Sequence, residues 1–393
     1  MAAVLACLLI VIISVTVVVL LHAPSPASAT LLVESHSVVP GSPPTVRWPT
    51  EGEAAWSVPS LGVRDHSAVQ SAVPIGSIAK LMTAIVVLRD HPLTPGRDGP
   101  VVTVTEADLA SFRAEVAADQ SNVTIQSGEM LSERQLVEGL LIHSGNDYAD
   151  LIGRLDAASS TAFVAKMNAT AAAMGLTRTS YADASGFDPS TVSTPAEQLI
   201  VAQAALRDPL IASLVDQTSV NLPVAGSVST YTPLVGTGGV VGVKSGLTTQ
   251  AGGCDVLARD LVIGGHIVQI LTAVTGQHAA DRLKAAGAEA FRLSTEVGAG
   301  IIPVPISGAD APLANLGWGS DIVPVIAKHP VVVPGWPGTV VTVSMRLRRH
   351  VTTSLPRGST VGLVRVESGA TTWHATVFTA ASLTPPGLLD RVV

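Results

Sequence analysis

Ser77 and Lys80 are the first residues of this chain whose types and spacing suggest chemistry, and they lie in the segment VPIGSIAKLMTAIVVLRDHP at 73–92. Apolar residues follow at three- and four-residue spacing, which predicts one buried face of a helix. Residues three apart are neighbours on a helix, and burial lowers the pKa of a lysine. The pair therefore indicates a nucleophilic hydroxyl beside a neutral amine base. A helix start whose lysine reaches solvent is the alternative interpretation, because the pattern is short.

Two further segments carry polar residues of matching chemistry. LIHSGNDYAD at 141–150 places Ser144 and Asn146 directly after a helix expected at 133–142, so that both side chains project from a loop. GVVGVKSGLTTQAGGC at 239–254 predicts a strand that carries Lys244-Ser245-Gly246. A glycine inside a strand is typical of close approach by another group.

These residues complement the pair at 77 and 80. A second cation such as Lys244 lowers the pKa of a nearby lysine. Ser144 is suited to relay a proton to a leaving amine, and Asn146 to hold a substrate amide. Lys244 with the Ser245 hydroxyl suits a terminal carboxylate of the substrate. The tetrahedral oxygen of an acyl transfer also needs two backbone donors.

The order Ser-x-x-Lys, Ser-x-Asn, Lys-Ser-Gly resembles that of the penicillin-recognising serine enzymes. The segments PIGSIAKLMTA, LLIHSGNDYA and GVVGVKSGLTTQAGGC are similar to those of the low-molecular-mass D-alanyl-D-alanine carboxypeptidases, as is MNATAAAMGLTRTSYADASGFD. The similarity covers about residues 50–295. It implies an α/β (α+β) penicillin-binding, β-lactamase-like transpeptidase fold, with an antiparallel sheet between helical layers.

The resemblance also implies a mechanism and partners. Ser77 attacks the carbonyl between the last two D-alanines of a peptidoglycan stem peptide, and Lys80 takes its proton. The oxyanion binds to the backbone N–H groups of Ser77 and Leu247. Ser144 serves catalysis, and Asn146, Lys244, Ser245 and Gly246 bind the substrate. β-Lactams are expected to acylate Ser77, and no cofactor or metal is implied.

One departure and several alternatives bear on this hypothesis. The family usually has threonine where this chain has Ser245, so the hydroxyl remains but the β-branch that restricts its rotamer is lost. A D,D-endopeptidase is an alternative, as is a non-catalytic penicillin-binding wall sensor. A serine β-lactamase is a further alternative, but no Glu-x-x-x-Asn follows Ser144 to support the glutamate-assisted deacylation of the commonest class.

Composition excludes some other classes of function. The net charge is −7 and no long basic run is present, so nucleic acid is not an expected partner. The cysteines are Cys7 and Cys254, and Cys7 lies in an apolar N-terminal segment, so we expect no disulfide between them. No Cys/His cluster has the spacing of a zinc site.

The N-terminus indicates export from the cytoplasm. Ala2 to Leu21 is twenty uncharged residues, long enough to span a bilayer, so 1–22 is either a retained membrane anchor or a signal segment. The small residues Ala27-Ser28-Ala29 resemble a processing site. We therefore expect an extracytoplasmic protein of the cell envelope, membrane-anchored, or secreted if the segment is cleaved.

The rest of the chain divides by composition into three parts. Residues 23–46 are rich in Pro, Ser and Ala and predict a tether. Residues 47–300 read as a strand, several helices, a hairpin-linked sheet and a last helix, which predicts the catalytic domain. Residues 301–393 alternate Pro and Gly with short β-branched runs, which predicts a small β-rich domain.

Overall fold

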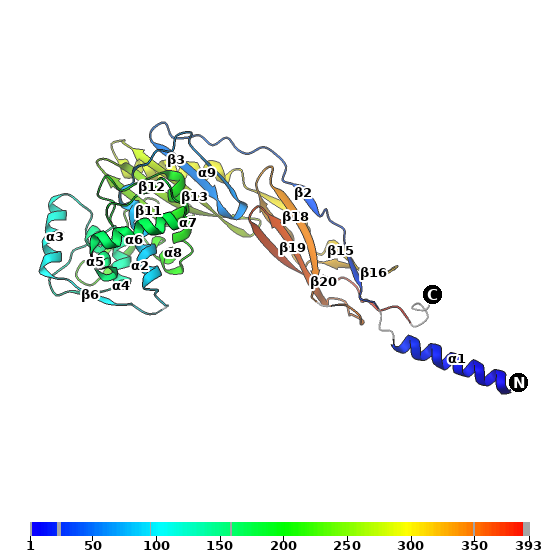
Figure 1. Cartoon of the computed structure of the whole chain (residues 1–393). Coiled ribbons are helices and arrows are strands. Elements are labelled where there is room, and N and C mark those ends of the chain that lie inside the picture. The colour runs from blue at the N-terminus through cyan, green and yellow to red at the C-terminus, as the bar shows by residue number, and fades with distance from the viewer. Residues whose placement is uncertain (1, 22–24, 95, 158, 349, 388–393) are drawn as a thin grey trace. The chain divides into compact units, whose positions relative to one another are not determined.

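The computed structural model describes residues 2–21, 25–94, 96–157, 159–348 and 350–387, with the backbone alone for 2–6 and 18–21. The chain forms two compact units, which are described separately below (Figure 1). One unit comprises 44–262 and 267–300; because it contains the three motifs, and the sequence predicts a catalytic domain at 47–300, it is called the catalytic unit below. The other comprises 1–43, 263–266 and 301–393.

The catalytic unit is built on a five-stranded sheet with the order β11-β12-β13-β3-β4. The strands are β3 (Glu53–Val58), β4 (Val63–His66), β11 (Val240–Thr248), β12 (Gly252–Ile263) and β13 (His266–Gln277). The pairs β11–β12, β13–β3 and β3–β4 are antiparallel. Because β11 pairs only with β12 in this sheet, it forms the sheet edge, and Lys244 lies on that edge strand.

Helices cover both faces of this sheet. They are α2 (Lys80–Asp90), α3 (Glu106–Ala117), α4 (Glu133–Leu141), α5 (Asn146–Asp156), α6 (Ser160–Ala173), α7 (Pro195–Ala205), α8 (Pro209–Val215) and α9 (Arg282–Gly298), with 3₁₀ turns at Pro59–Leu61 and Gly76–Ala79. Successive residues of a strand point to opposite faces. Accordingly Ala54 packs in a cluster with Leu293 of α9, whereas Ala55 belongs to the core that contains the helices from α2 to α7. The sheet therefore lies between helical layers, as the sequence predicts.

Local signals explain where the helices near the motifs begin. Ser132 and Gln135 form a reciprocal capping box at the start of α4, because Ser132 Oγ accepts from the Gln135 N–H and Gln135 Oε1 accepts from the Ser132 N–H. The sequence Thr194-Pro195-Ala196-Glu197 has the pattern of a second capping box, but only half of that box is formed. Thr194 caps α7, but the Glu197 carboxylate accepts instead from the backbone N–H groups of Thr177 and Arg178.

Three two-stranded ladders complete the catalytic unit. They are β5 (Val73–Pro74) with β8 (Val192–Ser193), β6 (Val101–Thr103) with β7 (Met130–Ser132), and β9 (Ser219–Leu222) with β10 (Gly226–Ser229). Cys254 is fully buried on β12, and both Cys7 and Cys254 are free, as the sequence predicts.

The second unit is β-rich, in agreement with the pattern of 301–393. A seven-stranded sheet has the order β1-β15-β16-β20-β19-β18-β2, and β14 pairs with β17. The strands are β14 (Ile302–Ser307), β15 (Pro312–Trp318), β16 (Asp321–Ile326), β17 (Val331–Gly335), β18 (Val340–Leu347), β19 (Thr360–Ser368) and β20 (Thr371–Thr379). Valine and leucine dominate its core.

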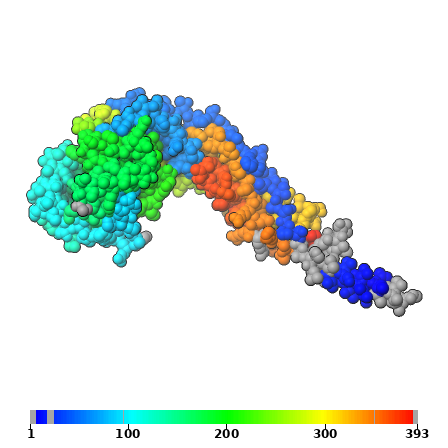
Figure 2. Space-filling model, in the orientation of Figure 1, coloured from blue at the N-terminus to red at the C-terminus, as the bar shows by residue number. Residues whose placement is uncertain are grey.

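The tether expected over residues 23–46 requires correction. The strands β1 (Ser28–Leu31) and β2 (His36–Val38) form the two edges of the seven-stranded sheet, where β1 pairs with β15 and β2 pairs with β18. In Figure 2 the blue N-terminal residues run along the orange C-terminal strands. The partner strand of β1 lies almost 300 positions away in sequence. Few apolar residues mark these edge strands in the sequence, although Ala27 and Val39, which flank them, are both buried.

Helix α1 spans Ala2–Leu21, over the apolar segment expected at the N-terminus. In the part of the chain whose side chains the structure describes, no single helix is long and apolar enough to cross a membrane. The bent pair α7–α8 passes that test by length and composition alone, and its two helices pack into the core of the catalytic unit.

Candidate active site

Ser77 lies in the 3₁₀ turn Gly76–Ala79, and Lys80 is the first residue of α2. Lys80 Nζ and the Ser77 hydroxyl are hydrogen-bonded at 2.8 Å, the distance expected between a base and its nucleophile. Gly76 has φ +53°, a left-handed conformation that favours glycine, and a β-carbon there would lie 3.0 Å from the Leu247 nitrogen. The turn thus brings the hydroxyl of Ser77 close to strand β11.

Lys80 is completely buried and has two further partners. Its Nζ donates to Asn146 Oδ1 at 2.5 Å and to the Ser185 carbonyl at 3.1 Å. Burial holds the pKa of Lys80 well below its usual 10.5, and the charge of Lys244 lowers it further, although Asp183, among other carboxylates, opposes the shift. The arrangement favours a neutral amine, which is able to accept the proton of Ser77.

Ser144 lies between α4 and α5, as the sequence predicts, whereas Asn146 is not in that loop but is the first residue of α5. Ser144 is 3% exposed and has φ +63°, a backbone conformation that is uncommon outside glycine and that occurs at functional sites. The Asn146 amide donates to Gln120 Oε1 at 2.5 Å. Gln120 therefore orients the amide so that its oxygen faces Lys80.

Lys244, Ser245 and Gly246 lie on β11, beside Ser77. Lys244 is fully buried, and burial lowers its pKa to about 7, against an opposing effect of Asp255. The Ser245 hydroxyl donates to the Tyr231 carbonyl at 3.1 Å. A β-carbon on Gly246 would collide with the Ile75 carbonyl and lie 3.0 Å from the Ser77 nitrogen. Only glycine permits this approach of the two backbones.

The backbone N–H groups of Ser77 and Leu247 are neighbours because of this close approach. The Leu247 nitrogen lies next to Gly76, and the Ser77 nitrogen lies next to Gly246. Two such donors beside a nucleophile form the geometry that stabilises a developing oxyanion.

A cleft of about 1240 Å³ opens over these groups. Six of the eight site residues expected from sequence line it: Ser77, Ser144, Asn146, Ser245, Gly246 and Leu247. Lys80 and Lys244 are both buried, and Lys80 bonds directly to two of the lining residues. The structure therefore brings all three motifs together in one place.

The cleft also contains residues that the motifs did not reveal. Gln120, Tyr231 and Arg282 line it. Gln120 carries no motif signal, since it is one polar residue in a loop. Arg282 is the first residue of α9, and only its position after the last sheet strand could have suggested it.

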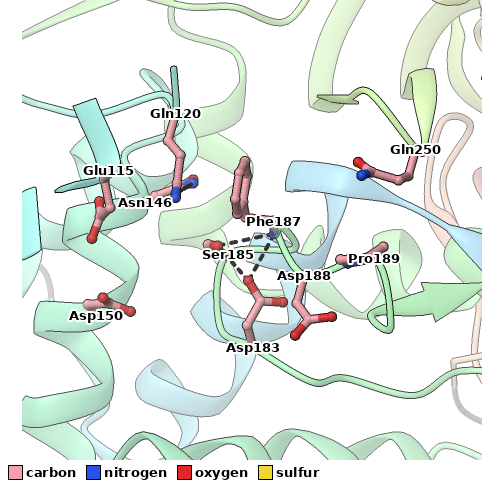
Figure 3. A pocket seen from close by; sticks show the side chains of 10 residues that line it. All are labelled: Glu115, Gln120, Asn146, Asp150, Asp183, Ser185, Phe187, Asp188, Pro189 and Gln250. Atoms are coloured by element: carbon pink, nitrogen blue, oxygen red, sulfur yellow. Dashed lines mark hydrogen bonds between the residues drawn. The ribbon is translucent and has the colours of Figure 1, made fainter. Parts of the chain in front are cut away.

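A smaller cavity of about 460 Å³ shares Gln120 and Asn146 with the cleft (Figure 3). Four carboxylates line it, those of Glu115, Asp150, Asp183 and Asp188. Burial, with Asp150 beside it, raises the pKa of Glu115 to about 7. Asp183 accepts from the Ser185 hydroxyl at 2.6 Å and from the Phe187 N–H at 2.9 Å, which fixes the loop whose carbonyl binds Lys80. Within the described ranges, no group of His, Cys, Asp and Glu has a metal-site arrangement.

Comparison with known proteins agrees with this geometry. Residues 65–260 match the model of the D-alanyl-D-alanine carboxypeptidase family of peptidases. A D-alanyl-D-alanine carboxypeptidase of Mycobacterium tuberculosis is 32% identical over 155 residues, which are 39% of this chain and 49% of that protein. A D-alanyl-D-alanine endopeptidase of Haemophilus influenzae is 28% identical over 144 residues, 37% of this chain and 46% of that protein. The chain thus spans about half the length of these curated relatives.

Solved structures confirm the fold expected from sequence. A DD-transpeptidase of Streptomyces superposes with a TM-score of 0.57 at 22% identity, covering 66% of this chain and 100% of that one. Penicillin-binding protein 5 from Haemophilus influenzae superposes with a TM-score of 0.58 at 18% identity, covering 88% of this chain and 99% of that one. At these identities the likeness concerns the fold alone.

Proposed function

Because the chain belongs to the D-alanyl-D-alanine carboxypeptidase family, we propose that it is a serine peptidase that removes the terminal D-alanine from peptidoglycan stem peptides. One observation carries the proposal: the Ser77 hydroxyl lies 2.8 Å from the fully buried amine of Lys80, at the floor of an open cleft. A serine hydroxyl that is hydrogen-bonded to a buried neutral amine is a nucleophile whose general base is already in position.

Acylation follows from the positions of these groups. Ser77 Oγ attacks the carbonyl carbon between the last two D-alanines, while Lys80 Nζ accepts the hydroxyl proton. The carbonyl oxygen becomes an oxyanion held by the backbone N–H groups of Ser77 and Leu247. Asn146 keeps Lys80 oriented through its Oδ1 and holds the substrate amide.

Collapse of the tetrahedral intermediate breaks the peptide bond. Ser144 relays a proton to the leaving nitrogen, and the free D-alanine departs from the part of the cleft beside β11. Ser245 and Arg282 line the cleft and Lys244 lies next to Ser245 on β11, and we assign these three residues to binding its carboxylate. Water then attacks the Ser77 ester, with Lys80 as base, and releases the shortened peptide. A β-lactam enters the same path through its strained amide and leaves slowly.

Endopeptidase activity is the second candidate, because relatives named D-alanyl-D-alanine endopeptidases match as well, for example that of Haemophilus influenzae. The two activities share the acyl-enzyme and differ in the leaving group, which is a free D-alanine or a cross-linked D-residue. Comparison of D-alanine release from a pentapeptide with cleavage of a cross-linked dimer separates them.

The location of the substrate leads us to propose an extracytoplasmic protein that α1 holds in the membrane. The segment Ala2–Leu21 is helical and uncharged, and twenty predominantly apolar residues match the thickness of a bilayer core. The catalytic unit then works on the wall side of that membrane.

The test measures D-alanine release from a pentapeptide ending in D-Ala-D-Ala, using the full chain with and without penicillin pre-treatment. We expect release that penicillin blocks. Ser77→Ala should abolish both release and covalent penicillin labelling, and Ser144→Ala should slow release.

A matched control exists in the second Ser-x-Asn of the chain, because Ser219 is exposed on β9 and outside the cleft. Ser219→Ala should leave both measurements unchanged. Peptide cleavage by Ser77→Ala would overturn the assignment of the nucleophile, and absence of any release with intact labelling would favour a penicillin-binding wall sensor.

A further inference from the structure

The chain between α1 and the β-rich unit is short and firmly attached at its far end. The Ser25 carbonyl accepts from the Trp318 indole N–H at 2.5 Å, and the Ala27 N–H donates to the Val351 carbonyl at 2.8 Å. Ala27 is 5% exposed within the core of that unit. Directly after it, β1 pairs with β15 over four residues. Residues 25–31 therefore belong to the folded β-rich unit.

This attachment limits how far Trp318 can lie from the end of α1. Helix α1 ends at Leu21, four residues before Ser25. An extended chain spans at most about 3.6 Å per residue, so the Ser25 carbonyl lies within about 15 Å of the helix end. The headgroup layer of a bilayer is about 5–8 Å thick on each side. If α1 spans the bilayer, the β15–β16 turn is within reach of the headgroups.

The residues at this end of the unit suit a lipid surface. Trp318 is half-buried, Ile322 is 50% exposed, and the turn residues Gly319 and Ser320 between them are exposed. Tryptophan is enriched at membrane–water interfaces, where its ring is apolar and its N–H polar. Asp321, also exposed, is the one acidic residue of this turn.

Cationic side chains lie on the chain that runs from β18 (Val340–Leu347) toward this end of the unit, with Arg346 about 23 Å from the level of Asp321 by strand register. Arg346, Arg348 and His350 are exposed on the segment that leads to Val351, the residue whose carbonyl binds Ala27. Among the described residues, neither Arg346 nor Arg348 forms an ion pair. Basic side chains close to a bilayer are attracted to anionic lipid headgroups.

We propose that the β15–β16 turn (318–322) rests on the headgroups of the membrane that holds α1, and that Arg346 and Arg348, on the strand and segment that lead toward this end, attract anionic lipid. The proposal rests on the proposed anchoring by α1. It gives the β-rich unit a second point of contact with the bilayer, besides its link to α1. Two points of contact restrict the orientations that this unit adopts relative to the membrane.

The same attachment makes Ala27-Ser28-Ala29 part of the fold. Cleavage after Ala29 would remove a buried core residue and half of the residues of β1. The structure thus favours a mature chain that keeps α1, which is the condition for the contact with lipid.

The experiment measures the depth of a fluorophore relative to the bilayer. The full chain carries Cys7→Ala, which leaves the buried Cys254 as its only native thiol. Ser320→Cys in the β15–β16 turn is labelled with an environment-sensitive dye, and the protein is reconstituted into phosphatidylcholine vesicles with or without phosphatidylglycerol. Quenching by nitroxide-labelled lipids reports contact with the headgroup region.

The control label is Ala370→Cys, in the exposed turn between β19 and β20. Val325 pairs with Thr379, and from this pair the register runs four residues to Asp321 in one direction and eight to Thr371 in the other. At about 3.3 Å per residue the two turns lie about 40 Å apart along the strands. We expect several-fold stronger quenching at 320 than at 370, and equal quenching would overturn the proposal.

A charge variant tests the lipid partner. Phosphatidylglycerol should increase quenching at 320, and Arg346→Gln with Arg348→Gln should remove that increase. Arg64→Gln with Arg207→Gln takes the same charge from exposed positions of the catalytic unit and should have no effect. An increase that survives the first double variant would contradict the role of the two arginines.

Two further readings separate this proposal from those on which it rests. Flotation with vesicles after a carbonate wash tests anchoring by α1, and its failure would overturn both anchoring and lipid contact. D-Alanine release by the same preparations tests the catalytic proposal. Flotation and release with equal quenching at the two turns would reject the lipid contact alone.

Discussion

Asp255 of β12 lies directly opposite Ser245 of β11 in the antiparallel ladder. Its side chain is fully buried, and neither carboxylate oxygen has a hydrogen-bond partner among the described residues. An acidic side chain at such a position is costly, and burial raises its pKa well above the usual value, although the charge of Lys244 opposes that shift. The chain therefore has a buried carboxyl group whose electrostatic partner is Lys244 of β11.

We predict that Asp255→Asn weakens substrate binding at neutral pH. The carboxylate of Asp255 raises the pKa of Lys244 against the effect of burial, so its removal lets that pKa fall below about 7. Lys244 then loses its proton at lower pH, and KM for the pentapeptide rises. If the pKa of Lys244 falls by one unit, kcat/KM at pH values above that pKa falls about tenfold. Asp65→Asn, an exposed change on β4, is the control, and an unchanged pH profile of Asp255→Asn would contradict the coupling.

The wild-type pH profile provides a second test. Lys244 binds a carboxylate only when protonated, and its pKa in the free enzyme is about 7, so kcat/KM should decline as pH rises through about 7. The bound carboxylate stabilises the protonated lysine, so kcat should decline only at higher pH. Initial rates between pH 5 and 10 give both profiles. A decline of kcat and kcat/KM at the same pH would mean that Lys244 does not contact the substrate carboxylate.

Ser245 tests whether the family's usual threonine is interchangeable with serine here. The hydroxyl now donates to the Tyr231 carbonyl, and Ser245→Thr keeps a hydroxyl that is able to do so. We predict activity within about threefold of wild type, whereas Ser245→Ala should raise KM by about tenfold, since a hydrogen bond to a charged group is worth about 1.5 kcal/mol. Steady-state kinetics of the three proteins decide. Loss of activity in Ser245→Thr would mean a pocket unlike that of the family.

Gly246 separates oxyanion stabilisation from substrate binding. A methyl group there collides with the Ile75 carbonyl and must push β11 away from Ser77. Because the Ser77 and Leu247 N–H groups separate, we predict that Gly246→Ala lowers kcat by at least about 100-fold and slows penicillin acylation. Gly308→Ala is the control, since its methyl would meet nothing nearer than 3.8 Å. Normal acylation by Gly246→Ala would exclude this pair of donors as the oxyanion site.

Three short motifs were sufficient to anticipate most of the site because each follows a recognisable element. Ser77 and Lys80 precede an apolar helix, Ser144 and Asn146 follow a capped helix, and Lys244 lies on a β-branched strand. The order of the motifs, together with the family resemblance, then predicted that they meet.

Other contributors had no local signal. Gln120 and Asp183 act through loops, where residue type alone does not indicate position. The sequence did not reveal the strands β1 and β2, because their partners lie far away in sequence and both strands are short pieces of a segment rich in Pro, Ser and Ala. The Glu197 carboxylate accepts from the N–H groups of Thr177 and Arg178 instead of from the N–H of its own N-cap, and only the folded chain reveals this alternative partner.

The last prediction concerns stability and involves Glu133, the first residue of α4. Its side chain is fully buried, and neither carboxylate oxygen has a hydrogen-bond partner among the described residues. Burial, with a smaller effect of Asp156, raises the pKa of Glu133 from 4.5 to about 7. A carboxyl group whose pKa is raised on folding stabilises the fold below its unfolded pKa, and this contribution is lost as pH rises through the folded pKa.

Wild type should therefore lose up to about 3 kcal/mol of unfolding free energy between pH 4.5 and 8 at this site, whereas Glu133→Gln, which cannot ionise, should not. The measurement is differential scanning calorimetry of both proteins at pH 5 and pH 8. The transition that penicillin acylation shifts is the unfolding of the catalytic unit, and its free energy is the quantity compared. Glu106→Gln, an exposed change in the first turn of α3, controls for a general loss of negative charge. If the difference in unfolding free energy between wild type and Glu133→Gln is the same at both pH values, Glu133 does not titrate between pH 5 and pH 8, which would contradict the prediction.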